Sequence, residues 1–467
     1  MAETEHFDVV VIGGGSGLTA AYYADEAGKS VALVERWTDR LGGTCVNVGC
    51  IPSKQLIQSA EVMKTIRAAD DFGITLDQSS VKVDMPAIFR AMRERRSKAN
   101  EGTQGWVEDA FTPVFDEVRF VDEKTLETKD GKRTITGDKF FLAVGARAAI
   151  PPIDGLDKIP YRTNADIFDI KGQPKSLVIL GGGYIGCEFG HFFSTLGTKV
   201  TIIDPSDHLL SEDDDIRTTF TKEFAKKVDL VTPYRAVAAV EEEGQYGFKV
   251  RKEDGDETRT VVGDMVLVAT GRRPNTDTLD LDKTSVKTDD KGWVQVDDHM
   301  RTSHPDIYAY GDCIGQGMFK HTSSFEGEIA YRNAFGADLK MDYSANPHAI
   351  FSDPQIGAVG LTERECQEKG LDYKAVKRDY KDIAKGEIIG KPPGFAKLLV
   401  EKGTRRILGF HMLGPHAADL VHEVVVAMTA EGAKADLIKR SIHIHPTMPE
   451  LIHTLFTEAV GSPYSDA

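Results

Sequence analysis

The chain has 467 residues, a length typical of three or four domains. Hydrophobic residues make up 41% of it, enough to fill several cores, which excludes a disordered chain. The 73 acidic side chains outnumber the 57 basic ones, and the net charge of −16 argues against nucleic acid as a partner. No apolar run reaches the roughly 20 residues that cross a bilayer. Because the N-terminus shows no targeting pattern, we expect a cytoplasmic protein without membrane contact.

The five cysteines are an odd and sparse set, which argues against a secreted disulfide framework. Only Cys45 and Cys50 lie close together in sequence. No histidine stands at ligand spacing beside them, so the sequence predicts no metal site. A close pair in a reducing compartment favours a chemical role over a structural one. We expect Cys187 and Cys313 to be buried, and Cys366 to be exposed on a helix.

The first elements predict a dinucleotide site. Gly13 and Gly15 follow an apolar strand and let the backbone approach a pyrophosphate at a helix N-terminus. Glu35 ends the next strand, where an acid binds ribose hydroxyls. Leu18 stands where the motif has its third glycine, which weakens the argument for close helix–strand packing there but leaves Gly13 and Gly15 at the phosphates. The expected elements are a strand at 7–12, a glycine turn at 13–17, a helix at 18–27 and a strand at 30–35.

The same unit recurs later in the chain. Gly181, Gly183 and Gly186 complete the pattern G-x-G-x-x-G after a second apolar strand. Asp204 ends the strand that follows, and no arginine lies nearby to receive a 2′-phosphate, so the sequence favours NAD over NADP. Two further strands, at 141–146 and 266–271, end in small-residue turns and support two nucleotide-binding domains. Three charged clusters, at 90–98, 212–215 and 241–243, are expected to be solvent-exposed.

A segment from Leu41 to Lys54, LGGTCVNVGCIPSK, lies just beyond the first unit. Its two thiols, five residues apart, can form a disulfide if the turn between them is not a regular helix, which Gly49 helps to permit. Lys54 follows Cys50 by one helical turn and can share its face. The segment resembles the redox-disulfide motif of the flavoprotein disulfide reductases, and the resemblance extends over nearly the whole chain.

The resemblance implies that the first unit binds FAD and the second binds the nicotinamide cofactor. It places Lys54 beside flavin N5, paired with Glu188, where a cation favours negative charge on reduced flavin. Lys320 departs from the small residue usual in dihydrolipoyl dehydrogenases. The implied FAD residues are Gly13, Gly15, Glu35, Thr44, Lys54, Gly145, Asp312, Met318, Phe319 and His321, and the implied NAD residues are Gly181, Gly183, Gly186, Glu188, Asp204, Val237 and Gly271.

A histidine near the C-terminus offers a proton carrier. His445 has the side chain whose ordinary pKa lies near neutrality, and Glu450 can bind its second ring nitrogen and fix the tautomer. The pair resembles the family's H-P-T-x-x-E. In that family it completes the site of the partner subunit, which implies a homodimer. His443 falls outside the motif, and we expect it to have a packing role.

The resemblance also implies a chemistry and a fold. Cys45 exchanges with substrate and Cys50 faces the flavin, with Lys54, Glu188, His445 and Glu450 completing the catalytic set. The expected fold is α/β, with two Rossmann-like dinucleotide-binding domains and a C-terminal α+β dimerisation domain. The predicted boundaries are 1–155 (FAD domain, first part), 156–276 (NAD domain), 277–345 (FAD domain, second part) and 346–467 (dimerisation domain).

Within the family, the sequence favours the dihydrolipoyl dehydrogenases, which oxidise the dithiol of a lipoyl-carrying protein with NAD⁺. Three alternatives stay open. The chain could be an NAD(P)H-dependent reductase of small disulfides, similar to mycothione or glutathione reductase. It could be similar to mercuric reductase, although its tail lacks that enzyme's cysteine pair. It could also be an FAD-binding redox sensor without disulfide turnover, for which the cysteines and His445 would be unnecessary.

Overall fold

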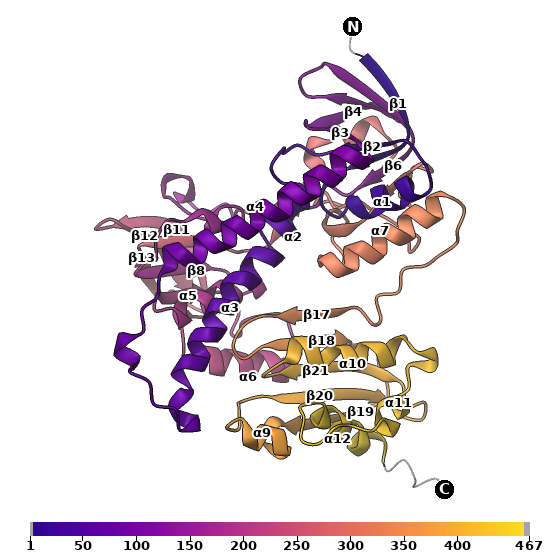
Figure 1. The fold of residues 1–467 in the computed structure, drawn as a ribbon. Helices are drawn as coiled ribbons and strands as arrows, with labels where there is room; N and C mark the ends of the chain where they lie inside the picture. Colours follow the sequence, from indigo (N-terminus) through magenta and orange to yellow (C-terminus); the bar gives the residue numbers. More distant parts are fainter. Residues whose placement is uncertain (1–2, 462–467) are drawn as a thin grey trace.

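The computed structural model describes residues 3–461, so the tail at 462–467, which lacks the cysteine pair, lies outside the described residues. Within this range, no helix combines the length and apolarity that crossing a membrane requires. The chain forms an α/β fold of three parts: a first βαβ domain, a second βαβ domain and a C-terminal domain (Figure 1). The expected fold class is confirmed.

The first domain is built on a seven-stranded sheet in the order β3-β2-β1-β6-β5-β4, with β16 beside β6. The strands β1, β2 and β6 are parallel and almost wholly buried along Val9–Ile12, because α1 and α7 pack together on the sheet (Figure 1). Its elements are β1 (Glu3–Ile12), α1 (Leu18–Glu26), β2 (Val31–Val34), β3 (Thr112–Val114), β4 (Val118–Asp122), β5 (Thr125–Thr128), β6 (Arg133–Leu142), β16 (Ile307–Ala309) and α7 (Lys320–Ala334).

The second domain repeats the parallel core on a smaller scale. Its four-stranded sheet has the order β10-β9-β8-β14, and a separate antiparallel sheet, β11-β12-β13, lies beside it. A short ribbon of β7 (Ala146–Ala148) and β15 (Arg272–Pro274) connects the two domains. The elements are β8 (Ser176–Leu180), α5 (Tyr184–Thr195), β9 (Lys199–Ile203), α6 (Asp214–Phe224), β10 (Asp229–Val231), β11 (Tyr234–Glu242), β12 (Gln245–Lys252), β13 (Thr258–Gly263) and β14 (Met265–Val268).

Two long helices, α3 (Cys50–Arg67) and α4 (Met85–Ala110), follow the short helix α2 (Gly43–Asn47) and run diagonally between the domains (Figure 1). They share one buried core with α5 of the second domain, in which Leu56, Phe89 and Phe192 are at most 1% exposed. The Phe89 and Phe192 rings meet edge to face at 6.0 Å. This packing fixes α3 against α5, although α3 ends at Arg67 and α5 begins only at Tyr184.

The C-terminal domain contains a five-stranded antiparallel sheet in the order β17-β18-β21-β20-β19. Helix α10 packs against β17, β18 and β21, and α12 packs against β19 and β20 (Figure 1). Its elements are β17 (Pro347–Ile350), β18 (Ile356–Gly360), α8 (Glu363–Glu368), β19 (Tyr373–Asp379), α9 (Ala384–Ile388), β20 (Phe395–Glu401), β21 (Ile407–Leu413), α10 (Ala417–Thr429), α11 (Asp436–Arg440) and α12 (Pro449–Val460).

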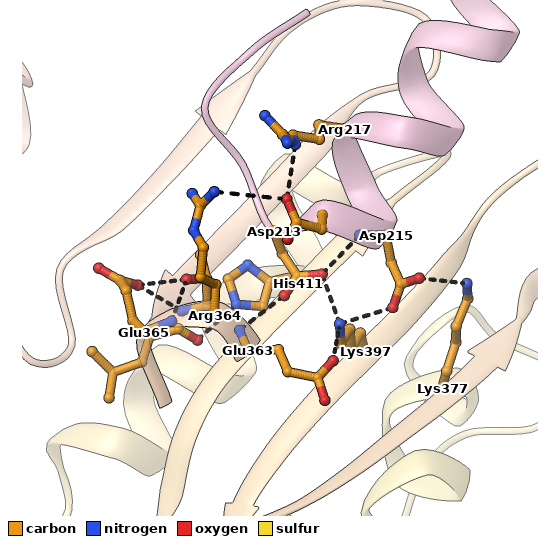
Figure 2. Close-up of polar contacts among 12 residues, drawn as sticks. Asp213, Asp215, Arg217, Glu363, Arg364, Glu365, Lys377, Lys397 and His411 are labelled. Carbon is orange, nitrogen blue, oxygen red and sulfur yellow. Dashed lines mark hydrogen bonds and ion pairs between the residues drawn. The ribbon is translucent and has the colours of Figure 1, made fainter. Parts of the chain in front are cut away.

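A buried charge cluster joins the second domain to the C-terminal domain (Figure 2). The Lys397 ammonium lies 2.8 Å from Asp213, 2.8 Å from Asp215 and 2.6 Å from Glu363, and the Lys397 side chain is only 4% exposed. Burial alone would lower the pKa of Lys397, but the three carboxylates outweigh it and raise that pKa. The acidic run at 212–215 was expected to be exposed, and for Asp213 and Glu212 that expectation is wrong. Both are buried, because Lys397 and His348 of the C-terminal domain pair with them.

The burial of the three cysteines outside the redox motif can also be compared with what was expected for them. Cys187 and Cys313 are buried, as expected. Cys366 is fully buried rather than exposed, because the inner face of α8 packs its thiol against Leu399 and Leu408. The charged residues around Cys366 lie on the outer side of the same helix, and they dominate the sequence pattern.

Candidate active site

The two cysteines of the motif open onto one cleft between the first and second domains. Cys45 lies in α2 and Cys50 is the first residue of α3, and the backbone between them leaves the helical conformation at Gly49 (φ −151°, ψ −117°). This break brings the two side chains together. Both thiols are free, and the Cys45 thiol donates a hydrogen bond to the Cys50 sulfur.

The two thiols have unequal acidity. The hydrogen bond from Cys45, supported by the charge of Lys54, lowers the pKa of Cys50 to about 7 against the effect of burial. The same hydrogen bond, together with burial, raises the pKa of Cys45. The lowered pKa favours Cys50 as the first of the two thiols to ionise. That Cys50 carries the thiolate of the reduced pair stays a prediction.

Lys54 and Glu188 form an ion pair across the domain boundary. The Lys54 ammonium lies 2.7 Å from each Glu188 carboxylate oxygen, and the Glu188 side chain is 6% exposed. The Phe351 backbone N–H donates to Glu188 at 3.2 Å, and the Phe351 ring lies 4.7 Å below the ammonium. Because α3 is packed on α5, this pair joins residues 134 positions apart and orients the cation toward the cleft.

The first glycine loop lines the cleft and packs closely against neighbouring backbone. A Cβ added at Gly15 would lie 3.2 Å from the Gly43 backbone, and one added at Gly13 would overlap the Ala143 carbonyl. The Gly14 N–H donates to Glu35 Oε2 at 2.9 Å, at the N-terminus of α1. The loop thus offers close backbone approach and helix N–H groups, the features that bind phosphate. Residues predicted for FAD that line the cleft are Gly13, Gly15, Glu35, Thr44, Lys54, Gly145, Asp312 and Met318.

Phe319 and His321, also predicted for FAD, do not line this cleft. Their rings stack on each other with centroids 5.4 Å apart, and His321 Nε2 lies 2.8 Å from the Pro347 carbonyl oxygen. Met318 precedes them with a positive φ of 32°, which turns the chain into α7. Their contact with the flavin stays a prediction.

Arg272 belongs to the cleft and was missed in the sequence analysis. Its side chain is 8% exposed and lies 3.1 Å from Asp312, whose own pKa is raised by burial. It also donates to the Ala146 carbonyl at 2.6 Å. The available signal was its position directly after Gly271, at the end of a buried strand. Arg272 and Asp312 both line the cleft, as Lys54 does.

The second glycine loop repeats the geometry of the first. The Gly182 N–H donates to Asp204 Oδ2 at 2.7 Å, and the Ser206 N–H donates to Asp204 Oδ1 at 2.8 Å. A Cβ added at Gly186 would lie 2.1 Å from the Gly181 carbonyl oxygen, so the helix packs closely on the loop. Four residues predicted for NAD therefore share this loop. The others lie apart: Glu188 lines the first cleft, Val237 lies at a bulge of β11, and Gly271 follows β14.

His445 and Glu450 form a pair on the C-terminal domain. His445 Nδ1 lies 2.8 Å from Glu450 Oε1, and the Thr447 N–H donates to Glu450 Oε2 at 2.8 Å. The hydrogen bond to His445 lowers the pKa of Glu450, so the carboxylate stays charged. The His445 side chain is 71% exposed, and the described residues that line the cysteine cleft do not include it. Nearby, His443 pairs with Glu423 at 2.7 Å, which suits its expected packing role.

Comparison with known proteins assigns the first two domains and the C-terminal domain to one protein family. Residues 7–327 match the family model described as pyridine nucleotide-disulphide oxidoreductase, and residues 346–456 match the dimerisation domain of the same family. The chain belongs to the pyridine nucleotide-disulphide oxidoreductase family. It is 36% identical to the dihydrolipoyl dehydrogenase of Chlamydia pneumoniae, with 96% of each chain covered.

Other relatives within the family carry different names. The chain is 34% identical to the mycothione reductase of Mycobacterium tuberculosis, with 96% of this chain and 98% of that protein covered. It also superposes on a Cu(II) complex of the HOCl-induced flavoprotein disulfide reductase RclA from Escherichia coli. That match has a TM-score of 0.85 and 27% identity over 97% of this chain and 99% of that one. The comparisons thus show an FAD-dependent disulfide oxidoreductase that uses a nicotinamide cofactor.

Proposed function

We propose that this protein is a dihydrolipoyl dehydrogenase, which oxidises the dihydrolipoamide of a lipoyl-carrying protein with NAD⁺. The observation that carries the proposal is the adjoining Cys45 and Cys50 pair, with the Lys54–Glu188 ion pair in the same cleft. Asp204, bonded at the second loop, supports NAD as the nicotinamide cofactor. The relatives named dihydrolipoyl dehydrogenase support the substrate. The cysteines outside the redox pair, Cys187, Cys313 and Cys366, are free thiols, which suits a reducing cytoplasmic location.

The chemistry starts from the oxidised pair, with a disulfide between Cys45 and Cys50. A substrate thiolate attacks the Cys45 sulfur, a mixed disulfide forms, and Cys50 leaves as a thiolate. The second substrate thiolate then attacks the substrate sulfur of that mixed disulfide, which closes the lipoyl ring and releases Cys45. The substrate loses two electrons and two protons, and the electron pair stays on the two cysteines. The low pKa of Cys50 makes it the better leaving group.

His445 serves as the base. With Nδ1 held by Glu450, the free nitrogen is Nε2, which accepts a substrate thiol proton. Because His445 is exposed and does not line its own chain's cleft, it serves the cleft of a second copy in a homodimer. FAD, which cleft residues such as Gly13, Gly15 and Asp312 would hold, would supply two-electron transfer between the cysteines and the nicotinamide cofactor. Lys54 would supply a positive charge to that site.

Two inactive variants test the assignment and the dimer together. We expect Cys50→Ser to abolish dihydrolipoamide oxidation, and His445→Gln to slow it by about 10²–10⁴-fold. A heterodimer of the two contains one complete site. Mixed, reassociated subunits should therefore recover about a quarter of the wild-type rate, since half of the dimers are mixed and each has one working site. No recovery from mixed dimers of confirmed composition would place His445 in its own chain's site or outside catalysis.

Substrate choice is tested by direct competition. Anaerobic turnover of dihydrolipoamide with NAD⁺ is compared with turnover of mycothiol disulfide and glutathione disulfide with NADH or NADPH. Brisk reduction of a small disulfide beside negligible dihydrolipoamide oxidation would replace the proposal with a small-disulfide reductase. Lys320 favours that second candidate, because mycothione reductases share a lysine before the histidine in this motif. Loss of both activities with FAD bound would favour the redox sensor.

A further inference from the structure

Lys320 opens onto the same cleft as the two cysteines and is not used by the mechanism above. It is the first residue of α7 and donates a hydrogen bond from its ammonium to Ser324 Oγ at 2.8 Å. The Ser324 hydroxyl in turn lies 3.0 Å from the Lys320 carbonyl oxygen. These contacts within one helical turn restrain the ammonium at the wall of the cleft. Lys320 is also the residue that departs from the small side chain usual in dihydrolipoyl dehydrogenases.

The two lysines of the cleft differ in how their charges are balanced. Lys54 has the Glu188 carboxylate at 2.7 Å. For Lys320, the described residues place no carboxylate within ion-pair distance, and the charges that act on it are the sulfurs of Cys45 and Cys50. Lys320 is therefore the cation of this cleft whose natural counter-ion is a thiolate.

The other ionisable groups around the cleft do not change the balance between the Lys320 charge and the two thiols. Arg272 and Asp312 neutralise each other at 3.1 Å, as Lys54 and Glu188 do. Tyr184 stays neutral because burial raises its pKa. The ionisable groups that line the cleft are Glu35, Arg36, Arg40, Cys45, Cys50, Lys54, Arg147, Tyr184, Glu188, Arg272, Tyr310, Asp312 and Lys320. Among them, Arg147 is paired with Asp277.

The charge of each lysine acts mainly on the pKa of a different thiol. Burial lowers the pKa of Lys320, and charge on Cys45, more than on Cys50, opposes that effect. In return, the Lys320 charge acts to lower the pKa of Cys45, and it does so more strongly than Lys54 does. For Cys50 the leading charge is Lys54. Each thiol thus has its own cation.

We propose that Lys320 is a second cation of the redox centre, which stabilises the thiolate of Cys45, the sulfur that exchanges with substrate. The inference rests on the proposed function only in taking Cys45 as the exchanging thiol. Its consequence is that the reduced enzyme can present a nucleophilic Cys45 to a disulfide substrate at lower pH than it could without the Lys320 charge. Lys320 would thereby favour the disulfide-reducing direction.

The test isolates Cys45 in the FAD-loaded Cys50→Ser protein, where the exchanging thiol titrates alone. The rate of Cys45 alkylation by iodoacetamide is measured against pH and assigned by peptide mass spectrometry. In this background, Lys320→Met should raise the midpoint of the pH profile by about one unit, because a cation that lines the same cleft has been lost. Tenfold less thiolate, partly offset by a more nucleophilic sulfur, should slow alkylation about threefold below both midpoints.

Matched variants separate charge from structure. Lys320→Arg should restore the parental midpoint, whereas Lys98→Ala, which removes an exposed lysine of α4, should not move it. Lys320→Ala supplies a second neutral variant, carrying a small residue as in related enzymes. FAD content and near-UV circular dichroism show that each protein is folded. A parental midpoint in a folded, FAD-loaded neutral variant would overturn the proposal.

The experiment uses no substrate, so its outcome is distinct from that of the proposed function. If the enzyme fails to oxidise dihydrolipoamide while the midpoint shifts with Lys320, the substrate assignment falls and the role of Lys320 stands. If turnover is as proposed and the midpoint does not shift, only the role of Lys320 falls.

Discussion

The two glycine loops perform the same structural task with different spacing. In each, the acid at the end of the second strand accepts the N–H of the loop's second glycine, Glu35 from Gly14 and Asp204 from Gly182. In the second loop, the close contact between helix and strand is made at Gly186, the third glycine of the motif.

In the first loop that close contact is made one position earlier, at Gly17. A Cβ added there would lie 2.0 Å from the Gly13 carbonyl oxygen, and one added at Gly186 would lie 2.1 Å from the Gly181 carbonyl oxygen. Because Leu18 stands at the position of the motif's third glycine, the sequence left the packing of this helix on its strand open. The structure answers the question, because Gly17 provides the contact. The physical requirement is a missing side chain at the point of closest approach, and the fold can meet it at either spacing.

The largest expected effect comes from adding one methyl group at these contacts. Gly17→Ala should abolish stable FAD binding, whereas Gly186→Ala should keep FAD and weaken NADH binding. An overpacked contact costs up to about 3 kcal/mol, which corresponds to roughly 100-fold in affinity. Bound FAD is measured by absorbance after gel filtration, and NADH affinity by fluorescence titration.

Gly102 supplies the control, because it lies on α4 with nothing within 4 Å of an added Cβ. Gly102→Ala should leave both cofactors bound and should stabilise the helix slightly. Normal FAD content in folded Gly17→Ala would show that the first loop does not depend on this contact.

A smaller effect on cofactor binding is expected when Asp204 or Glu35 is replaced by its amide. Asp204→Asn should raise the KM for NADH about tenfold with kcat little changed, since a hydrogen bond to a charged group is lost equally in ground and transition states. Glu35→Gln should leave the KM for NADH unchanged and weaken FAD instead. Steady-state kinetics at saturating disulfide or dithiol measure both constants. Equal sensitivity of the KM to the two changes would remove the assignment of one acid to each cofactor.

The smallest effect concerns pH. Burial raises the pKa of Glu35 in the folded protein free of FAD. This carboxyl therefore contributes stability that is present below its ordinary pKa and is lost as pH rises through the raised value. Glu35→Gln lacks that loss, so its stability relative to wild type should improve as pH rises from about 4 to about 7.5. Urea unfolding of the FAD-free proteins at both pH values measures the difference. A difference that stays constant or shrinks as pH rises would contradict a raised pKa for Glu35.

Much of the candidate site could be predicted because its signals are local. The two cysteines, Lys54 and the His445–Glu450 pair each stand within a few residues of their partners or of a recognisable motif. The structure then pairs Lys54 with Glu188 as expected, through the packing of α3 on α5. What could not be predicted depends on residues far apart in the chain. Arg272 pairs with Asp312, 40 residues later in the chain, and its position after Gly271 marks the end of a strand but not this partner.

The acidic run at 212–215 also shows that burial can depend on residues far away in the sequence. Four acids in a row normally favour solvent, since charges are costly to bury. Asp213 is buried because Lys397, 184 residues later, arrives on β20 to pair with it (Figure 2). The sequence shows which residues are charged, but it does not show which of them lie close together in the folded protein.

By itself, the sequence determined the order of the elements, the two dinucleotide units and the redox pair, since backbone periodicity, glycine turns and neighbouring thiols are set by adjacent residues. Only the tertiary structure decided which lysine faces which sulfur, which glycine makes the closest contact and which acids leave water. Those outcomes depend on electrostatic and packing energies that fall off within a few ångströms, and folding alone determines which residues come that close.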